Sequence, residues 1–202
     1  TPPSPLARLK LDVRVASPTE IARLKGDWDR LAACYVRDRR FEFGQSYFAQ
    51  SRRTLDRAYR QGDRSAALLA VIGLDHLDAG READALPFLQ AAADAGVLRP
   101  RVYLELARLR HAAFTAAFTE KQTVLTSFQT RDILGPLQAL RKMSPPLPGS
   151  YELLTRTLSQ SEITPGPEEL AWIAEGAHLF PRRLPIVIAV AAFHVRYGTT
   201  ET

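Results

Sequence analysis

One helical pattern occurs twice in this chain, and Tyr103 in the second copy follows Leu69 in the first by 34 positions. The copies share four positions without a gap: Leu69, Ile72, Gly73 and His76 in the first, and Tyr103, Leu106, Ala107 and Arg110 in the second. A repeat of this length is typical of stacked helix–turn–helix units, because no single unit can bury its apolar face alone. The period therefore predicts an all-α chain built from helix pairs.

Cap and turn residues divide the chain into about ten expected helices. The segment 17–20 reads Ser-Pro-Thr-Glu, in which the serine can cap a helix, the proline fits its first position and the glutamate completes a capping box. Gly62, Gly80 and Gly96 are expected to end three helices. Pro87 lies inside an expected helix and deletes one backbone hydrogen bond there. The first helix carries one apolar face, which we expect to be its packing face; its members are Ile21, Leu24, Trp28, Leu31 and Tyr35.

The first 17 residues differ from the rest. Apolar and charged residues alternate over 9–15, which is the period of a β-strand. Because a lone strand is not stable in water, we expect residues 1–17 to form an extended arm that packs on the first helices. Pairing with another chain, or a role as the tail of a further domain, are the alternatives. The chain starts at Thr1 rather than Met, which suggests a processed protein or an excised domain.

The helical pattern resembles the tetratricopeptide repeat family. The best match is 66–99, with apolar and small residues at the motif positions of both helices; they are Leu69, Ile72, Gly73, Ala85, Leu89 and Ala92. Another first-helix motif is Trp28-x-x-Leu31-Ala32-x-x-Tyr35. At the small motif positions two helices are expected to approach closely; these positions are Ala32, Gly73, Ala107 and Ala191.

This resemblance implies a right-handed superhelical solenoid of antiparallel helix pairs over residues 18–202. The expected units are about 18–65, 66–99, 100–146, 147–182 and a partial unit 183–198. The third unit contains an insertion, expected as a loop over 119–130, which is either solvated or a flap that contacts a partner. The last helix lacks a partner helix, which leaves Ile186, Val187, Val190 and Phe193 exposed. Either this helix caps the array or a second copy of the chain covers it in a homodimer.

The resemblance also implies that the first helices of the units line a concave groove, which holds an extended peptide or a partner helix. The candidate partner-binding residues are Arg30, Arg37, Leu74, Arg101, Glu105, Arg108, His111 and Arg156. Since arginine binds carboxylates with two parallel hydrogen bonds, the expected partner is an acidic segment or a peptide C-terminus. The alternative is that these are solvated groove residues.

Sequence motifs of catalysis are not found. There is no HExxH, no pair of histidines four residues apart and no glycine-rich phosphate loop, so we expect no catalytic residue, no metal site and no cofactor. The one cysteine, Cys34, is expected to be a buried thiol and leaves the compartment open between cytoplasm and export. No run of 18 apolar residues occurs, so no membrane span is expected.

These observations favour a non-catalytic scaffold for protein–protein interaction. A second hypothesis is the accessory repeat domain of a larger enzyme, for example a hydrolase whose catalytic domain precedes Thr1. A third is nucleic-acid binding through an arginine-rich face, because the net charge is +5 and the isoelectric point is about 9.6. Nucleic acid is the weaker partner, since the aromatic residues fall mostly at packing positions rather than between the arginines.

Overall fold

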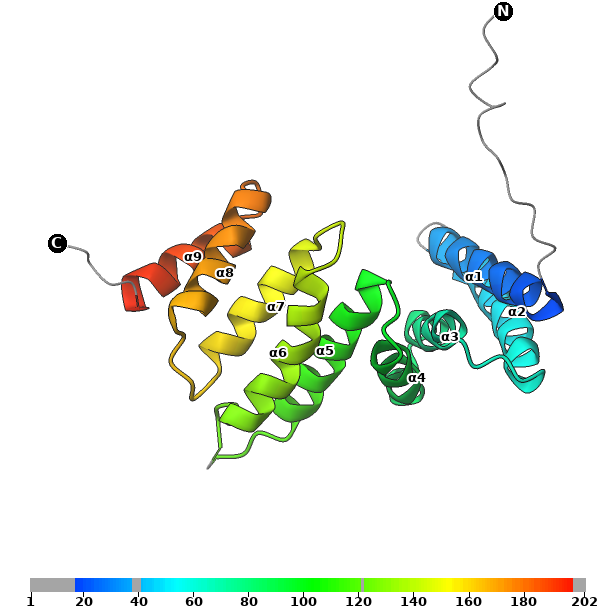
Figure 1. Ribbon diagram of the computed structural model, residues 1–202, viewed down its shortest axis with the longest axis horizontal. Coiled ribbons are helices and arrows are strands. Elements are labelled where there is room, and N and C mark those ends of the chain that lie inside the picture. Colours follow the sequence, from blue (N-terminus) through cyan, green and yellow to red (C-terminus); the bar gives the residue numbers. More distant parts are fainter. Residues whose placement is uncertain (1–16, 38–40, 121, 198–202) are drawn as a thin grey trace, which may run out of the picture. The chain divides into compact units, whose positions relative to one another are not determined.

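The computed structural model describes residues 17–37, 41–120 and 122–197, and it describes side chains of these residues outside 35–46. The described residues contain nine α-helices and no strand, so the all-α prediction is confirmed for this part of the chain (Figure 1). The helices are α1 (Pro18–Arg37), α2 (Phe41–Arg60), α3 (Ala66–Asp78), α4 (Glu82–Asp94), α5 (Pro100–Ala116), α6 (Ser127–Arg141), α7 (Pro148–Ser159), α8 (Pro167–Leu179) and α9 (Leu184–Tyr197). The expected arm, apart from Ser17, lies outside the described residues.

The chain divides into two compact units at a boundary between Arg64 and Ser65. Unit 1 contains α1 and α2, and unit 2 contains α3 to α9. Each unit is therefore described by itself.

Several helix ends lie where their sequence signals predict them. The Ser17 backbone N–H donates to Glu20 Oε2 at 2.7 Å, and the Glu20 N–H donates to Ser17 Oγ at 3.2 Å, which completes the capping box of α1. The three glycines that end α2, α3 and α4 adopt φ of 96°, 75° and 69°. Since side chains disfavour such left-handed backbone, glycine is the residue that permits these turns.

In unit 1, α1 packs on α2 through small residues. Ser51 Oγ donates to the Gly26 carbonyl at 2.9 Å, and the Leu55 side chain lies directly against Gly26. Ala33 is fully buried on the same face of α1. A glycine and an alanine seven residues apart let α2 approach so closely that this face, rather than the one with the large apolar side chains, becomes the contact.

The prediction that this apolar face of α1 packs on α2 is therefore wrong for the side chains that are described. The exposed fractions are 56% for Ile21, 46% for Leu24, 71% for Trp28 and 46% for Leu31. The face of α2 that contacts α1 contains Ser51, Leu55 and Ala58, which are buried.

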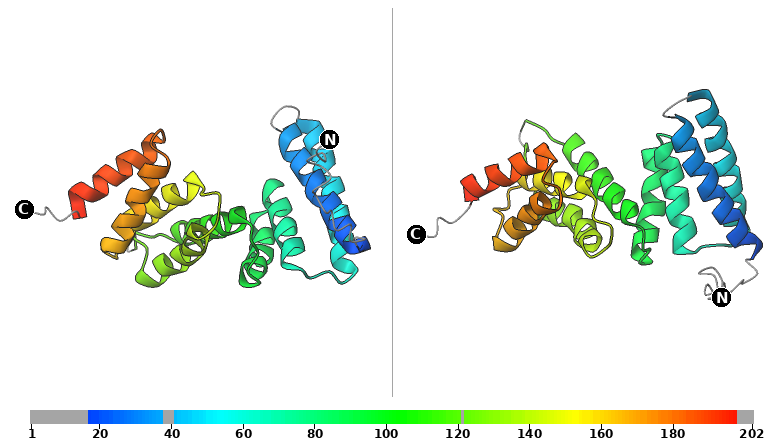
Figure 2. Two further views of the ribbon diagram at one scale, coloured as in Figure 1. Left: turned by 45° about the horizontal axis from the view of Figure 1, so that its top comes forward. Right: turned by 90° about the horizontal axis from the view of Figure 1, so that it is seen from above.

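In unit 2, consecutive helices pack side by side. Contacts join α3 to α4 and α5 to α6, while α7 contacts α5, α6, α8 and α9 (Figures 1 and 2). Gly73 of α3 lies against Leu89 of α4, and a Cβ at this glycine would be 2.7 Å from Leu89 Cδ2. The predicted close approach at Gly73 is thus confirmed. Ala107 is fully buried in α5, whereas Ala191 of α9 is exposed.

One cluster of buried apolar side chains extends from α3 to α9. Its largest fully buried members include Leu74, Leu89, Leu137, Leu154 and Ile173. Tyr151 joins α7 to α8, because its ring lies against Gly176 and its hydroxyl donates to Glu175 Oε1 at 2.7 Å. This continuous core fixes the relation of α5 to α7, on which the candidate site depends.

The predicted loop over 119–130 ends earlier than expected, because α6 already begins at Ser127. Thr126 and Gln129 form a capping box, with the Gln129 N–H donating to Thr126 Oγ1 at 3.3 Å. Leu125 is fully buried and its N–H donates to the Gln160 carbonyl at 2.7 Å. The segment is therefore shorter than expected and is fastened at Leu125 to the end of α7.

The prediction that α9 leaves Ile186 and Phe193 exposed is also wrong. Ile186 and Phe193 are buried against the core, because α9 contacts both α7 and α8. The exposed large side chains of this helix are instead Leu184, Ile188 and Val195.

Candidate functional site

A cleft of about 320 Å³ lies between α5 and α7. Arginines, a histidine, a carboxylate and small or apolar residues line it; they are Arg108, His111, Ala112, Gly149, Glu152, Leu153 and Arg156. Three of these, Arg108, His111 and Arg156, are predicted site residues, and the structure brings them together from two helices.

Gly149 makes room for the Arg108 side chain. A Cβ at Gly149 would be 2.8 Å from Nη2 of Arg108 and 3.3 Å from Cδ2 of Leu104. Because a real Cβ essentially never approaches that closely, any larger residue at 149 would displace the guanidinium. The first turn of α7 thus positions a cation that belongs to α5.

A row of alternating charges leads along α5 to this cleft. Arg101 donates through Nη2 to Asp78 Oδ1 of α3 at 2.5 Å, and its Nε lies 3.4 Å from Glu105 Oε1. Glu105 also accepts from Nη1 of Arg108 at 3.3 Å. Arg101 is consequently engaged by two carboxylates and serves to join α3 to α5. Arg108 shares the Glu105 carboxylate with Arg101, and about half of its side-chain surface is exposed.

His111 is a buried, hydrogen-bonded histidine at the floor of the cleft. Its Nε2 lies 2.9 Å from Gln160 Oε1, and the residue is 7% exposed. Burial lowers the pKa of His111 below its ordinary value of 6.5, the hydrogen bond to Gln160 opposes this shift, and the positive charge of Arg156 adds to it. The imidazole is therefore neutral at neutral pH and offers a hydrogen bond rather than a charge.

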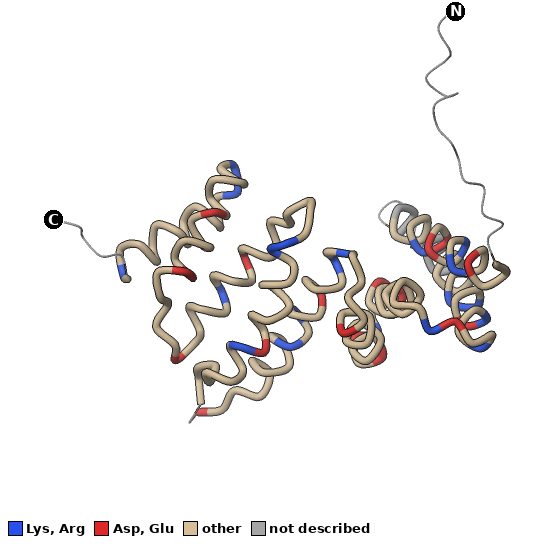
Figure 3. Tube along the Cα trace, viewed as in Figure 1, with Lys and Arg blue, Asp and Glu red and all other residues tan. Residues whose placement is uncertain are grey.

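Arg156 supplies the second exposed guanidinium of the cleft. The lining contains two guanidinium groups and one carboxylate, that of Glu152, and Arg108 also contacts Glu105 outside the lining. Basic and acidic residues are interspersed along α5, α6 and α7, whereas α3, α4 and α8 contain acidic residues and no lysine or arginine (Figure 3). A single carboxylate can thus be recognised here by charge and by the planar geometry of arginine.

The remaining predicted site residues do not line this cleft. Arg30 is 4% exposed and its Nη2 lies 3.1 Å from Asp27 Oδ1, so it is beneath the surface of unit 1. Leu74 is 1% exposed and belongs to the core of unit 2. The Arg37 side chain lies outside the described residues. The prediction that Arg30 and Leu74 line a groove is wrong, because motif spacing does not report how far each helix is rotated about its axis.

A second, apolar groove of about 320 Å³ adjoins the cleft and was not predicted from the sequence. It lies between α4 and α5, and Ala112 lines both. Its lining is Glu82, Ala83, Leu86, Leu109, Ala112, Ala113 and Ala116. The alanines at 112, 113 and 116 could have indicated this groove in the sequence, because small residues on one helix face leave space for a large side chain.

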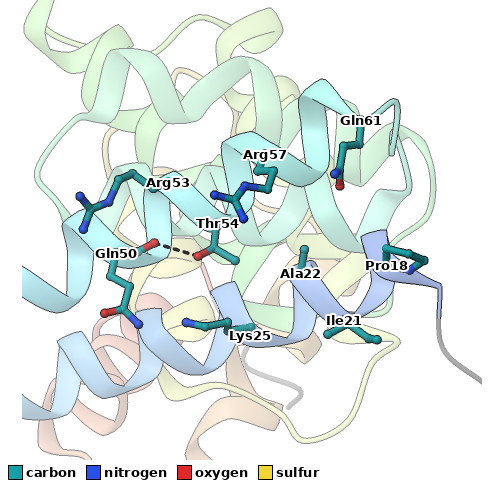
Figure 4. A pocket seen from close by; sticks show the side chains of 9 residues that line it. All are labelled: Pro18, Ile21, Ala22, Lys25, Gln50, Arg53, Thr54, Arg57 and Gln61. Carbon is teal, nitrogen blue, oxygen red and sulfur yellow. Dashed lines mark hydrogen bonds between the residues drawn. The ribbon is translucent and has the colours of Figure 1, made fainter.

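A separate groove of about 610 Å³ lies in unit 1 between α1 and α2 (Figure 4). Its basic members are Lys25, Arg53 and Arg57, and Ile21 contributes an apolar edge. Lys25 Nζ lies 2.6 Å from Asp29 Oδ2. No carboxylate lines this groove, so it is basic as well.

Within the described residues, no cluster of three or more histidine, cysteine, aspartate or glutamate side chains could hold a metal ion. Cys34 is half-buried rather than buried as expected. Among the helices of the described part, none has the length and apolar character needed to cross a membrane.

Comparison with known proteins gives no match: no family model, no curated protein and no solved structure matches this chain.

Proposed function

We propose that this chain is a non-catalytic scaffold with a tetratricopeptide-like array of helix pairs, and that its α5–α7 cleft binds an acidic segment of a protein partner. The single observation that carries the proposal is the convergence of Arg108, His111 and Arg156 in one cleft. In this reading α3, α5, α7 and α9 are the first helices of successive repeats. The contacts of α7 with both α5 and α9 support that order.

A partner carboxylate accepts hydrogen bonds from the guanidinium groups of Arg108 and Arg156. The apolar groove beside Ala112 receives a large apolar side chain of the same segment, because the two depressions adjoin on α5. The preferred ligand is thus an extended peptide in which an acidic residue lies close to a bulky apolar one. Arginine gives the carboxylate contact its direction, and burial of the apolar side chain adds affinity.

The test begins with selection of peptides by the full chain from a random peptide library displayed on phage. Selected sequences are expected to combine Asp or Glu with a large apolar residue. One selected peptide is then titrated against the variant Arg108→Glu/Arg156→Glu. We expect its affinity to fall by at least about 10-fold, since each charge-assisted contact contributes on the order of 1.5 kcal/mol or more.

The matched control is Arg182→Glu/Arg183→Glu, which makes the same change of net charge at two exposed arginines between α8 and α9. Affinity should be retained in this control. Selection of peptides without acidic residues, or an equal loss in both variants, would contradict the proposal.

A further inference from the structure

The apolar face of α1 has the spacing of a coiled-coil seam. Ile21, Leu24, Trp28 and Leu31 follow one another at intervals of three, four and three residues. This alternation places all four on one stripe of the helix, about 15 Å long at 1.5 Å per residue. Trp28, at the centre of the stripe, is 71% exposed.

The other helix of unit 1 leaves this stripe uncovered. α2 contacts α1 through Gly26 and Ala33, which lie on the side of α1 opposite to the seam. In heptad terms the stripe occupies the a and d positions, and the two small residues occupy f positions. A further helix can therefore lie along the stripe without displacing α2 from α1.

The two flanks of the stripe carry opposite charges. Lys25 lies on one flank, where it pairs with Asp29 of its own helix and is backed by Arg53 and Arg57 of α2 across the basic groove (Figure 4). Glu20 lies on the other flank, one position before Ile21. Glu20 is exposed, and its hydrogen bonds from the Ser17 backbone and side chain lower its pKa, so it is ionised at neutral pH.

We propose that this face binds a second copy of the same chain, with the two α1 helices parallel and in register. In a parallel pair each g position faces the e position five residues later in the partner. Glu20 of one copy then lies beside Lys25 of the other, and the basic groove of each copy faces the acidic flank of its partner. An antiparallel pair would instead bring equal charges together on both flanks, with lysine facing lysine.

The oligomeric state of the full chain, measured by sedimentation equilibrium over a wide concentration range, tests this inference. The wild-type chain is expected to dimerise, and Trp28→Glu is expected to raise the dissociation constant by at least about 30-fold, as loss of a central aromatic anchor does. The matched control is Phe128→Glu, which changes an aromatic residue of unit 2 that is 76% exposed. This control should dimerise like the wild type.

A charge exchange tests the orientation. Glu20→Lys and Lys25→Glu should each weaken the dimer, and each also removes a contact within its own copy, to Ser17 or to Asp29. The double variant Glu20→Lys/Lys25→Glu should associate more tightly than either single variant, because residues 20 and 25 meet only between copies. In a Cys34→Ser background, Leu31→Cys should form a disulfide between copies, since equivalent d positions face each other in a parallel pair.

Three results would overturn the inference: a chain that is monomeric throughout, a dimer that Ile188→Glu of α9 dissociates but Trp28→Glu does not, or a charge exchange that associates no more tightly than either single variant. This surface is in unit 1 and the peptide cleft is in unit 2, so failure of one proposal leaves the other standing.

Discussion

Replacement of Gly73 by alanine is the sharpest test of the α3–α4 helix pair. A new Cβ would lie 2.7 Å from Cδ2 and 2.8 Å from Cγ of Leu89, and 3.1 Å from its backbone nitrogen. Leu89 is fully buried among core side chains, so a turn of its side chain must displace some of them. The contact also involves the backbone of α4, which means that the two helices must move apart.

Two opposing effects set the magnitude. In an exposed helix the same substitution stabilises by up to about 1 kcal/mol, because alanine has the higher helix propensity. Overfilling a packed core costs about 1–3 kcal/mol, and the backbone contact places this site toward the upper end. We therefore expect Gly73→Ala to destabilise unit 2 by roughly 1–2 kcal/mol.

The assay is urea unfolding followed by the fluorescence of Trp172, which is 5% exposed in unit 2. Leu89→Ala removes the two short contacts with Cγ and Cδ2 and leaves the longer one with the backbone nitrogen, at its own cost of about 2–5 kcal/mol. In that background Gly73→Ala should become neutral or stabilising, which corresponds to a coupling energy of about 2 kcal/mol. Stabilisation by Gly73→Ala in the wild-type chain, or an equal effect in both backgrounds, would contradict the close contact between Gly73 and Leu89.

Three further predictions concern the cleft and its supports. Gly149→Ala should displace the Arg108 guanidinium and weaken binding of the selected peptide, whereas Gly135→Ala, where a new Cβ meets nothing within 4 Å, should leave its affinity unchanged in the same titration. The urea midpoint should fall as pH drops below 6.5, because the unfolded chain then binds a proton that the lowered pKa of His111 keeps off the folded chain. His111→Gln should reduce this loss of stability at low pH. A pH dependence that is the same in His111→Gln and in the wild type would contradict this role of His111. Thr126→Ala should destabilise by about 1 kcal/mol through loss of the α6 cap, while Thr123→Ala, at an exposed position just before that cap, should have little effect on the same urea midpoint.

The local structure of this chain could be predicted from its sequence to a large extent. Helix starts and ends are determined by short-range chemistry, as at Ser17 and at Gly62, Gly80 and Gly96. The start of α6 could also have been found, because Thr126-x-x-Gln129 is a capping-box pattern. The polar composition of the segment concealed it.

The rotation of a helix about its axis was harder to predict. α1 offers two faces to α2, one with large apolar residues and one with Gly26 and Ala33, and hydrophobic periodicity favours the first. The structure uses the second, because close approach at Gly26 lets the Leu55 side chain pack on the glycine and Ser51 donate to its carbonyl. The same limit applies to the site: motif spacing placed Arg30 and Leu74 in a groove, whereas their burial depends on helix rotation.

A nuclear magnetic resonance titration of the full chain with the selected acidic peptide tests directly whether the α5–α7 cleft binds that peptide. We expect shift changes concentrated at the backbone N–H groups of the lining residues and at the side-chain N–H groups of Arg108 and Arg156, with smaller changes at Ala112 and Ala113; the lining residues are Arg108, His111, Gly149, Glu152 and Arg156. Changes concentrated instead at Lys25, Arg53 and Arg57 of the basic groove, or changes spread evenly over all surface arginines, would contradict it.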